Sequence, residues 1–292
     1  MENKNITNSI TNSINTLFTN LHKSLDDGMF KILDEITFIN NDILNRKYFS
    51  GLLNDKVSGL IILANALLLA VLIYFGISYL FSRFSITKSY QSPLQFISKF
   101  IICAILINSS DFILDQILYI IGIITDCVRN IGISIFSFNV SFTFLSEELN
   151  KVFLSETFPM VNVFTFEGII HTFLYYGFIN LLFTYSLRYI FLNIFILLFP
   201  FAILSFALDS TSWILKMWLK NFFSLLLVQV VVSIILMITM SLKYSYSDST
   251  VKILYIGCLF ALLKANSFMR EFFSGFATDI SNGINSMKNL LG

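Results

Sequence analysis

The stretch VSGLIILANALLLAVLIYFGISYLF, residues 57–81, contains no charged side chain and is the clearest membrane span in the sequence. A helix needs about 20 apolar residues to cross the hydrocarbon core of a bilayer, and this stretch is long enough. The composition agrees, because 56% of the 292 residues are hydrophobic and only 13% are charged. Soluble domains average about 25% charged residues. The sequence therefore predicts an integral membrane protein.

Further apolar stretches predict additional spans after the first one. They are residues 93–127, 164–187, 189–208, 221–242 and 251–263. The last of these has only 13 residues, so it is either a re-entrant or interfacial segment or a short sixth span. Arg188 is predicted to mark a cytoplasmic turn between two spans. The predicted fold class is all-α, a polytopic integral membrane protein with five or six transmembrane helices and an amphipathic helical amino-terminal region.

The stretch 93–127 stays apolar but is interrupted by NSSDFILDQ, residues 108–116. We favour one long helix that leaves the hydrocarbon near Asp111 and Asp115, although two short helices also fit. Residues 128–163 would then form an extracytoplasmic segment. Its middle, IGISIFSFNVSFTFLSEEL, interleaves Ser and Phe and suggests an interfacial or subunit-covered structure.

Three basic residues orient the chain in the membrane. Arg83, Lys88 and Lys99 follow the first span with no acidic residue among them, so the positive-inside rule places this loop in the cytoplasm and the amino terminus outside. We expect a multi-pass protein of the inner (cytoplasmic) membrane. The predicted regions are an extramembrane amphipathic helical region at 1–56, a transmembrane helical domain at 57–265 and an amphipathic carboxy-terminal tail at 266–292.

Both tryptophans of the chain lie in DSTSWILKMWLKNFFSLLLVQVV, residues 209–231, together with two lysines. Trp and Lys are typical of the headgroup level of a bilayer, where an indole ring is half solvated and an ammonium group meets phosphate. We therefore predict an interfacial anchor formed by Trp213, Lys216, Trp218 and Lys220. It would lie on a short amphipathic helix that enters the fifth span.

A single amide interrupts the fifth span. Gln229 lies near the middle of this span, and an amide in hydrocarbon needs a hydrogen-bonding partner. We expect Gln229 to meet another helix or another subunit, and we predict the same for Asn180 in the third span. Either amide would also suit the lining of a pathway. On the helix that leads into the fifth span, Ile214, Trp218 and Phe222 share one face at a spacing of four.

The run LLFPFAILSFALDSTSWILKMWLKNFFSLLLVQVVVSIIL, residues 197–236, resembles the central segment of the TrbL family. The shared pattern is a span with Pro and small residues, a Ser/Thr turn, the motif W-x(4)-W-L-K, and a span with a lone Gln. TrbL proteins are polytopic inner-membrane channel subunits of type IV secretion and conjugation systems. The resemblance implies an outside amino terminus, about five membrane spans and a partner ATPase.

Two pairs of ionisable residues lie four positions apart in apolar surroundings. Asp111 and Asp115 form the first pair, and Glu167 and His171 form the second. Ionisable side chains at membrane depth are often functional, so a proton or ion relay is one interpretation. We favour the simpler one, in which both pairs lie at span ends, at the headgroup level, where water reaches them.

No catalytic or cofactor-binding motif stands out in the sequence. EGIIH, residues 167–171, differs from the zinc motif H-E-x-x-H, and the phosphate-binding pattern G-x-x-x-x-G-K-[ST] is missing. Cys103, Cys127 and Cys258 have no metal-ligand spacing. We therefore predict that the protein is not an enzyme and has no cofactor and no metal site. A gradient or a partner would supply the energy for any transport.

The favoured function is a channel or scaffold subunit of a type IV secretion (conjugative transfer) machine. It would contact the lipid bilayer, form a homo-oligomer, assemble with a secretion ATPase and other channel subunits, and touch the translocated DNA–protein or protein substrate transiently. The alternative is a transporter or permease component that binds an ion or solute through Asp111, Asp115, Glu167 and His171. A pore-forming lytic protein is a third possibility, against which the length and the many spans argue.

Overall fold

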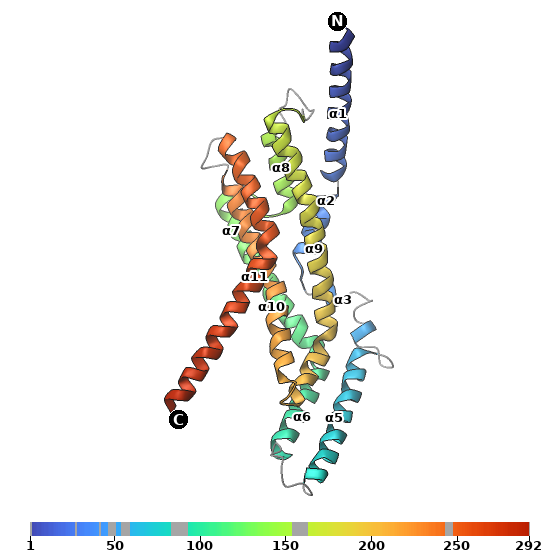
Figure 1. Ribbon diagram of the computed structural model, residues 1–292, viewed down its shortest axis with the longest axis vertical. Coiled ribbons are helices and arrows are strands. Elements are labelled where there is room, and N and C mark those ends of the chain that lie inside the picture. The colour runs from blue at the N-terminus through green and yellow to red at the C-terminus, as the bar shows by residue number, and fades with distance from the viewer. Residues whose placement is uncertain are drawn as a thin grey trace. The chain divides into compact units, whose positions relative to one another are not determined.

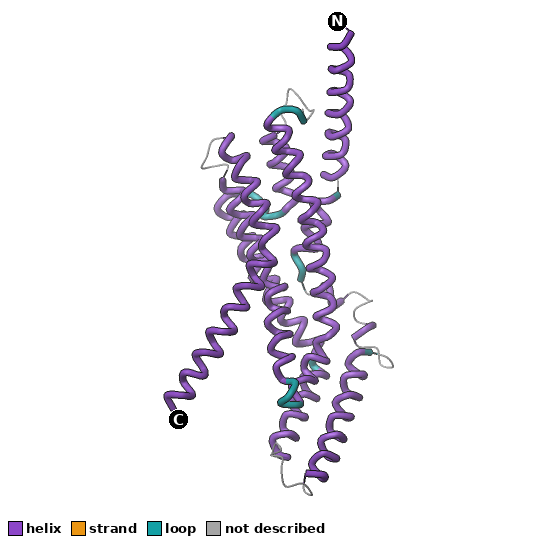
Figure 2. The backbone as a smooth tube through the Cα atoms, viewed as in Figure 1, coloured by secondary structure: helices purple, strands orange, loops and turns teal. Residues whose placement is uncertain are grey.

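The computed structural model describes residues 2–26, 28–40, 42–45, 51–53, 59–82, 93–153, 163–242 and 248–291. Nearly all of these residues are helical, and no strand is present among them (Figure 1, Figure 2). The elements are α1 (Glu2–Asp26), α2 (Met29–Thr37), α3 (Asp42–Asn45), α5 (Leu60–Ser82), α6 (Pro93–Asn108), α7 (Ser110–Phe136), α8 (Phe142–Phe153), α9 (Phe166–Leu204), the 3-10 turn η1 (Ser205–Ala207), α10 (Ser212–Ser241) and α11 (Asp248–Leu291). The all-α prediction is confirmed.

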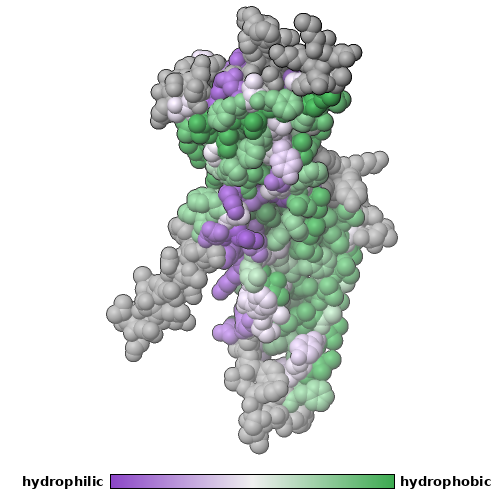
Figure 3. Space-filling view, turned by 45° about the horizontal axis from the view of Figure 1, so that its top comes forward, coloured by the Kyte–Doolittle hydropathy of each residue, from purple (hydrophilic) through white to green (hydrophobic). Residues whose placement is uncertain are grey.

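Several helices have the length and composition of membrane spans. Four candidate spans occur in the described part of the chain: Leu60–Phe81, Phe166–Ala207, Ser212–Ser241 and Thr250–Phe273. α6 and α7 make a fifth if the two count as one bent span. Hydrophobic residues also dominate the described surface in the view of Figure 3. A polytopic membrane protein is therefore confirmed, with four or five candidate spans where the sequence predicted five or six.

Some of the predicted membrane features fall outside the described residues. These are positions 57 and 58 at the start of the first span, together with Arg83 and Lys88 in the loop that follows it. The orientation of the chain, which rests on those two basic residues and Lys99, stays a prediction.

The prediction of one long helix over residues 93–127 is wrong. α6 and α7 are separate helices, bent by 65° where they meet. At the end of α6, the side-chain amide of Asn108 donates to the Ala104 carbonyl at 2.8 Å, and the Ser109 N–H donates to the Ile105 carbonyl at 3.0 Å. Ser109 stands between the two helices. The polar interruption noticed in the sequence is therefore a sharp bend.

The predicted turn at Arg188 is also wrong, because α9 runs through it without a break. α9 has 39 residues, so it is about 58 Å long, roughly twice the thickness of the hydrocarbon core. The neighbours Leu187 and Tyr189 are not helix breakers. Arg188 can stay inside the helix because its charge has a buried acceptor, as described below. Pro200 also lies inside α9, near its end.

α11 joins the predicted short span and the predicted tail in one helix of 44 residues. The candidate span within it, Thr250–Phe273, has 24 residues, so residues 251–263 are not an isolated short segment. Near its start, Lys252 pairs with Glu167 of α9. The predicted boundary at residue 265 falls inside this helix.

The chain forms two compact units. Unit 1 contains Met1–Ile39, Ile123–Tyr189 and Leu227–Met269, and unit 2 contains Asn40–Gly122, Ile190–Leu226 and Arg270–Gly292. These units cut across the predicted regions 1–56, 57–265 and 266–292. The location of residues 1–56 outside the bilayer stays a prediction.

In unit 1, the amino-terminal region contributes to the core. The apolar face of α2 buries Met29, Phe30 and Leu33, and α2 packs on α8. The Phe30 ring meets the Phe178 ring of α9 edge-on, with 5.1 Å between the centroids. Because α2 alternates apolar and polar positions at helical spacing, one of its faces can be buried while the other stays polar.

In unit 2, α5 packs on α6. The rings of Phe75 and Phe96 stack with their centroids 3.6 Å apart. The amides of Asn65 and Asn108 exchange two hydrogen bonds, with N–O distances of 3.0 and 3.3 Å. This reciprocal pair satisfies two amides on otherwise apolar helices.

Candidate functional site

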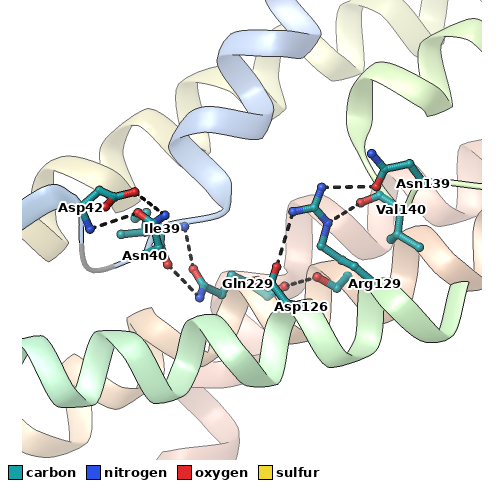
Figure 4. Close-up of polar contacts among 9 residues, drawn as sticks. Ile39, Asn40, Asp42, Asp126, Arg129, Asn139, Val140 and Gln229 are labelled. Atoms are coloured by element: carbon teal, nitrogen blue, oxygen red, sulfur yellow. Dashed lines mark hydrogen bonds and ion pairs between the residues drawn. The ribbon is translucent and has the colours of Figure 1, made fainter. Parts of the chain in front are cut away.

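Gln229 is fully buried in α10, with an exposed fraction of 0%. Its Oε1 accepts a hydrogen bond from the Ile39 N–H at 2.9 Å, and its Nε2 donates to the Ile39 carbonyl at 3.1 Å (Figure 4). The side chain therefore pairs with both backbone groups of one residue, as a neighbouring β-strand would. Ile39 follows the end of α2, where backbone groups have no partner within the helix. Gln229 was predicted to meet another helix or another subunit, but its partner is a loop residue of the same chain.

Arg188 binds the same segment two residues earlier. Its guanidinium Nη1 donates to the Thr37 carbonyl at 3.0 Å, and its exposed fraction is 2%. Thr37 is the last residue of α2, and the carbonyls at a helix carboxyl end carry partial negative charge. The Thr37 carbonyl therefore gives this buried cation one favourable acceptor. We call Arg188 and Gln229 the α2 clamp, because both bind backbone groups at the end of α2.

Asp34 connects the other side of α2 to α8. Its Oδ1 accepts from the Phe142 N–H at 2.7 Å, and its Oδ2 accepts from the Thr143 N–H at 3.0 Å and from the Thr143 hydroxyl at 2.6 Å. Phe142 and Thr143 begin α8, so Asp34 acts as a cap supplied by another helix. Burial raises the pKa of Asp34 above its ordinary value, and these hydrogen bonds oppose the shift.

Arg129 of α7 lies beside the same region. Its Nε donates to the Val140 carbonyl at 3.0 Å, and its Nη2 donates to the Asn139 Oδ1 at 3.4 Å (Figure 4). The guanidinium also lies over the Phe38 ring, 4.9 Å from the centroid. Arg129 thus holds the loop between α7 and α8, and through Phe38 it also contacts the segment that Arg188 and Gln229 bind.

The chemistry of this site is structural. Arg188 and Gln229 bind backbone groups, and Asp34 binds the start of a helix. In an apolar environment such bonds act as glue between segments. Among the described residues, no three His, Cys, Asp or Glu side chains lie close enough together to hold a metal ion.

The structure divides the four residues of the predicted interfacial anchor. Trp213 has an exposed fraction of 57%, and Lys216 is also exposed. Trp218 is only 6% exposed, so its ring does not lie half solvated as the sequence predicted. Lys220 is half-buried.

Trp218 instead packs inside unit 2. Its Nε1 donates to the Phe195 carbonyl of α9 at 3.2 Å. Its ring stacks on Phe222 with 4.6 Å between the centroids and lies 4.8 Å from the Phe199 ring. The prediction that Trp218 and Phe222 share a face is confirmed, and this face is turned toward α9.

The four predicted ionisable residues are divided between the two units. Asp111 and Asp115 belong to unit 2, whereas Glu167 and His171 belong to unit 1. Asp115 accepts from the Gln116 amide at 3.2 Å, and Glu167 pairs with Lys252. His171 is buried with its ring 4.8 Å from the Tyr175 ring. Asp111 differs, because its buried Oδ1 has no hydrogen-bond partner among the described residues.

The other predicted amide, Asn180, is exposed on α9. Three residues that build the site, Arg188, Asp34 and Arg129, were not predicted as site residues. The position of Arg188 as a lone charge in an apolar run was interpreted as a turn, although such a charge is often buried and paired. Asp34 and Arg129 lie among other polar residues and had no such signal.

Comparison of the chain with protein-family models, with curated proteins and with solved structures found no match.

Proposed function

We propose that this protein is a channel or scaffold subunit of a type IV secretion (conjugative transfer) machine in the inner membrane. The observation that carries the proposal is the resemblance of residues 197–236 to the central segment of the TrbL family. In this role several copies would assemble with a membrane-associated ATPase and help to pass a DNA–protein or protein substrate.

The residues of the resembling pattern support a scaffold role, because they join α9 to α10. At the turn, the Thr211 hydroxyl donates to the Ser205 carbonyl at 2.8 Å. Trp218 binds across to Phe195. Gln229, the lone Gln of the pattern, binds Ile39. Each of these polar groups fixes backbone, which is what a framework of helices needs.

The contacts also agree with transport that is driven by a partner. The buried side chains of Arg188, Gln229 and Trp218 each donate a hydrogen bond to a backbone carbonyl. The sequence has no nucleotide-binding pattern, so a separate ATPase would supply the energy.

The test is an affinity purification from native membranes. The tagged protein is solubilised in mild detergent, and the co-purifying proteins are identified by mass spectrometry. We expect enrichment of a secretion-type ATPase and other channel subunits over a tagged, unrelated multi-pass protein of similar abundance. Recovery of the protein alone, or with a solute-binding protein, would rule out the secretion proposal.

One observation favours the second candidate, a transporter component that binds an ion or solute. Asp111 places a carboxylate oxygen in a buried position beside the bend between α6 and α7, and interrupted membrane helices often carry ion sites in transporters. The test is Asp111→Asn in an uptake assay, with Asp115→Asn, Glu167→Gln and His171→Gln beside it. Loss of uptake in the Asp111 variant would support this candidate, and unchanged cellular fluxes would reject it.

A further inference from the structure

An asparagine lies in the middle of an exposed apolar stripe on α9. Between positions 169 and 187 of this helix, the exposed residues are Ile169, Phe173, Tyr176, Asn180, Phe183 and Leu187. We call these six residues the α9 stripe. They all belong to unit 1, and from first to last they cover about 27 Å at 1.5 Å per residue, close to the thickness of the hydrocarbon core.

The spacing of the α9 stripe is that of a helix-pairing seam. Successive positions are four, three, four, three and four residues apart, which is the heptad spacing of the a and d positions in coiled coils. The positions between them, such as Leu174, Phe178 and Leu181, are buried in the chain's own core. α9 therefore presents one continuous face outward, with Tyr176 and Phe183, 70% and 64% exposed, on either side of Asn180.

Asn180 decides what covers this face. It lies 13 positions after Glu167 and eight before Arg188, so it is roughly 20 Å and 12 Å along the helix from these charged residues. Lipid chains offer no hydrogen-bond donor or acceptor, and an exposed amide in hydrocarbon is costly. The α9 stripe therefore needs a partner that brings both a donor and an acceptor to this depth.

A second copy of the same chain meets this need directly. An amide is self-complementary, and Asn180 of a second copy inserted in the same direction lies at the same depth. The chain itself contains such a pair, because Asn65 and Asn108 exchange two amide hydrogen bonds on neighbouring helices. A single Asn at an a position also sets register and oligomeric state in coiled coils. We propose that the α9 stripe is the interface between two copies, with Asn180 paired to Asn180.

This interface requires only that α9 crosses a bilayer, and it does not depend on the secretion function. The affinity purification can therefore support the secretion function while cross-linking rejects the α9 interface. Cross-linking can equally support the interface while the purification rejects the secretion function.

The first test is disulfide cross-linking in native membranes. The parent carries Cys127→Ser, because Cys127 is exposed whereas Cys103 is buried. Tyr176→Cys, Asn180→Cys and Phe183→Cys should each give a cross-linked dimer under mild oxidation. Leu69→Cys on α5, which is exposed to a similar degree at 54%, is the matched control and should give no dimer. Cross-linking at Leu69 alone, at no position, or only to a different protein would overturn the proposal.

The second test measures association directly, by energy transfer between two labelled populations in lipid bilayers. Asn180→Leu should weaken association about 3- to 30-fold, the range expected for losing interhelical hydrogen bonds in a membrane, and Asn180→Gln should retain most of it. Position 180 is exposed, so neither change disturbs the core. Equal association of Asn180→Leu and wild type would show that Asn180 does not hold two copies together, and would overturn the proposal.

Discussion

Gln229 and Ile39 lie 190 positions apart in the chain and exchange two hydrogen bonds, with N–O distances of 2.9 and 3.1 Å. This pairing ties the middle of an apolar helix to the segment that follows α2. Arg188 binds the Thr37 carbonyl beside it. The amino-terminal region is therefore held through its backbone groups, and the Ile39 side chain is buried as well.

Replacing Gln229 with Leu should destabilise the protein by roughly 2–4 kcal/mol, because it leaves the buried N–H and carbonyl of Ile39 without their partner. The measurement is the unfolding free energy in detergent, with unfolding monitored by circular dichroism. Gln116→Leu is the matched control, since Gln116 is an exposed glutamine on an apolar helix, and it should change stability little. Equal effects of the two changes would contradict the importance of the Gln229–Ile39 pair.

The two tryptophans should respond differently to replacement by Phe. Trp218→Phe removes the hydrogen bond to Phe195 and some buried ring area, at a cost of about 1–2 kcal/mol. Trp213→Phe, at an exposed position, should stay within about 0.5 kcal/mol of wild type.

Fluorescence gives an independent measure of the two environments. In the Trp213→Phe variant, the remaining Trp218 should resist quenching by acrylamide. In the Trp218→Phe variant, the exposed Trp213 should be quenched more strongly when the protein is in detergent. Similar quenching of both would contradict the burial of Trp218.

Asp34 should make stability depend on pH. Its pKa is raised from 3.8 in the folded state, chiefly by burial, so the folded state holds its proton more tightly than the unfolded state. Stability from this group is fully present below pH 3.8 and is lost as pH rises through the higher folded pKa.

The measurement compares the unfolding free energies of wild type and Asp34→Asn across this range. The advantage of wild type over the variant should shrink as pH rises from 4. Glu35→Gln changes the exposed position next to Asp34, and its unfolding free energy should change with pH as that of wild type does. A wild-type advantage that grows with pH would show that the hydrogen bonds from Phe142 and Thr143 outweigh burial.

Two glycines in helices should tolerate alanine differently. A Cβ at Gly132 would lie 2.3 Å from the Val140 Cγ2, whereas a Cβ at Gly76 meets nothing within 4 Å. Gly132→Ala should therefore cost about 1–3 kcal/mol through overpacking, and Gly76→Ala should be neutral or stabilising by up to about 1 kcal/mol.

A double variant identifies the cause of the loss at Gly132. Adding Val140→Ala to Gly132→Ala removes the clash, so the pair should be more stable than the sum of the two single changes predicts. Strict additivity would point to a cause other than contact with Val140.

Much of the fold could be read from the sequence, because apolar length and helical spacing are local properties. The span around residues 60–81 and the shared face of Trp218 and Phe222 follow from the order of residues alone. The need of Gln229 for a buried partner follows in the same way, from the chemistry of an amide in an apolar run.

The partners themselves could not be read from the sequence. Every residue has a backbone N–H and carbonyl, apart from proline's missing N–H, so nothing in the letters marks Ile39 or Thr37 as the acceptor for a distant side chain. Arg188 was predicted to mark a turn because a charge in an apolar run usually ends a span. The carbonyl that accepts its hydrogen bond belongs to Thr37, 151 positions away.

The sequence by itself determined that this is a helical protein of the membrane, where its apolar stretches lie, and that Gln229 requires a partner. Only the tertiary structure decided that α9 continues through Arg188, that the chain bends by 65° between α6 and α7, and that Asn180 faces outward while Gln229 and Trp218 are buried. The physical reason is that hydropathy reports only whether a side chain prefers water or an apolar environment. Packing between distant segments decides which contacts it makes.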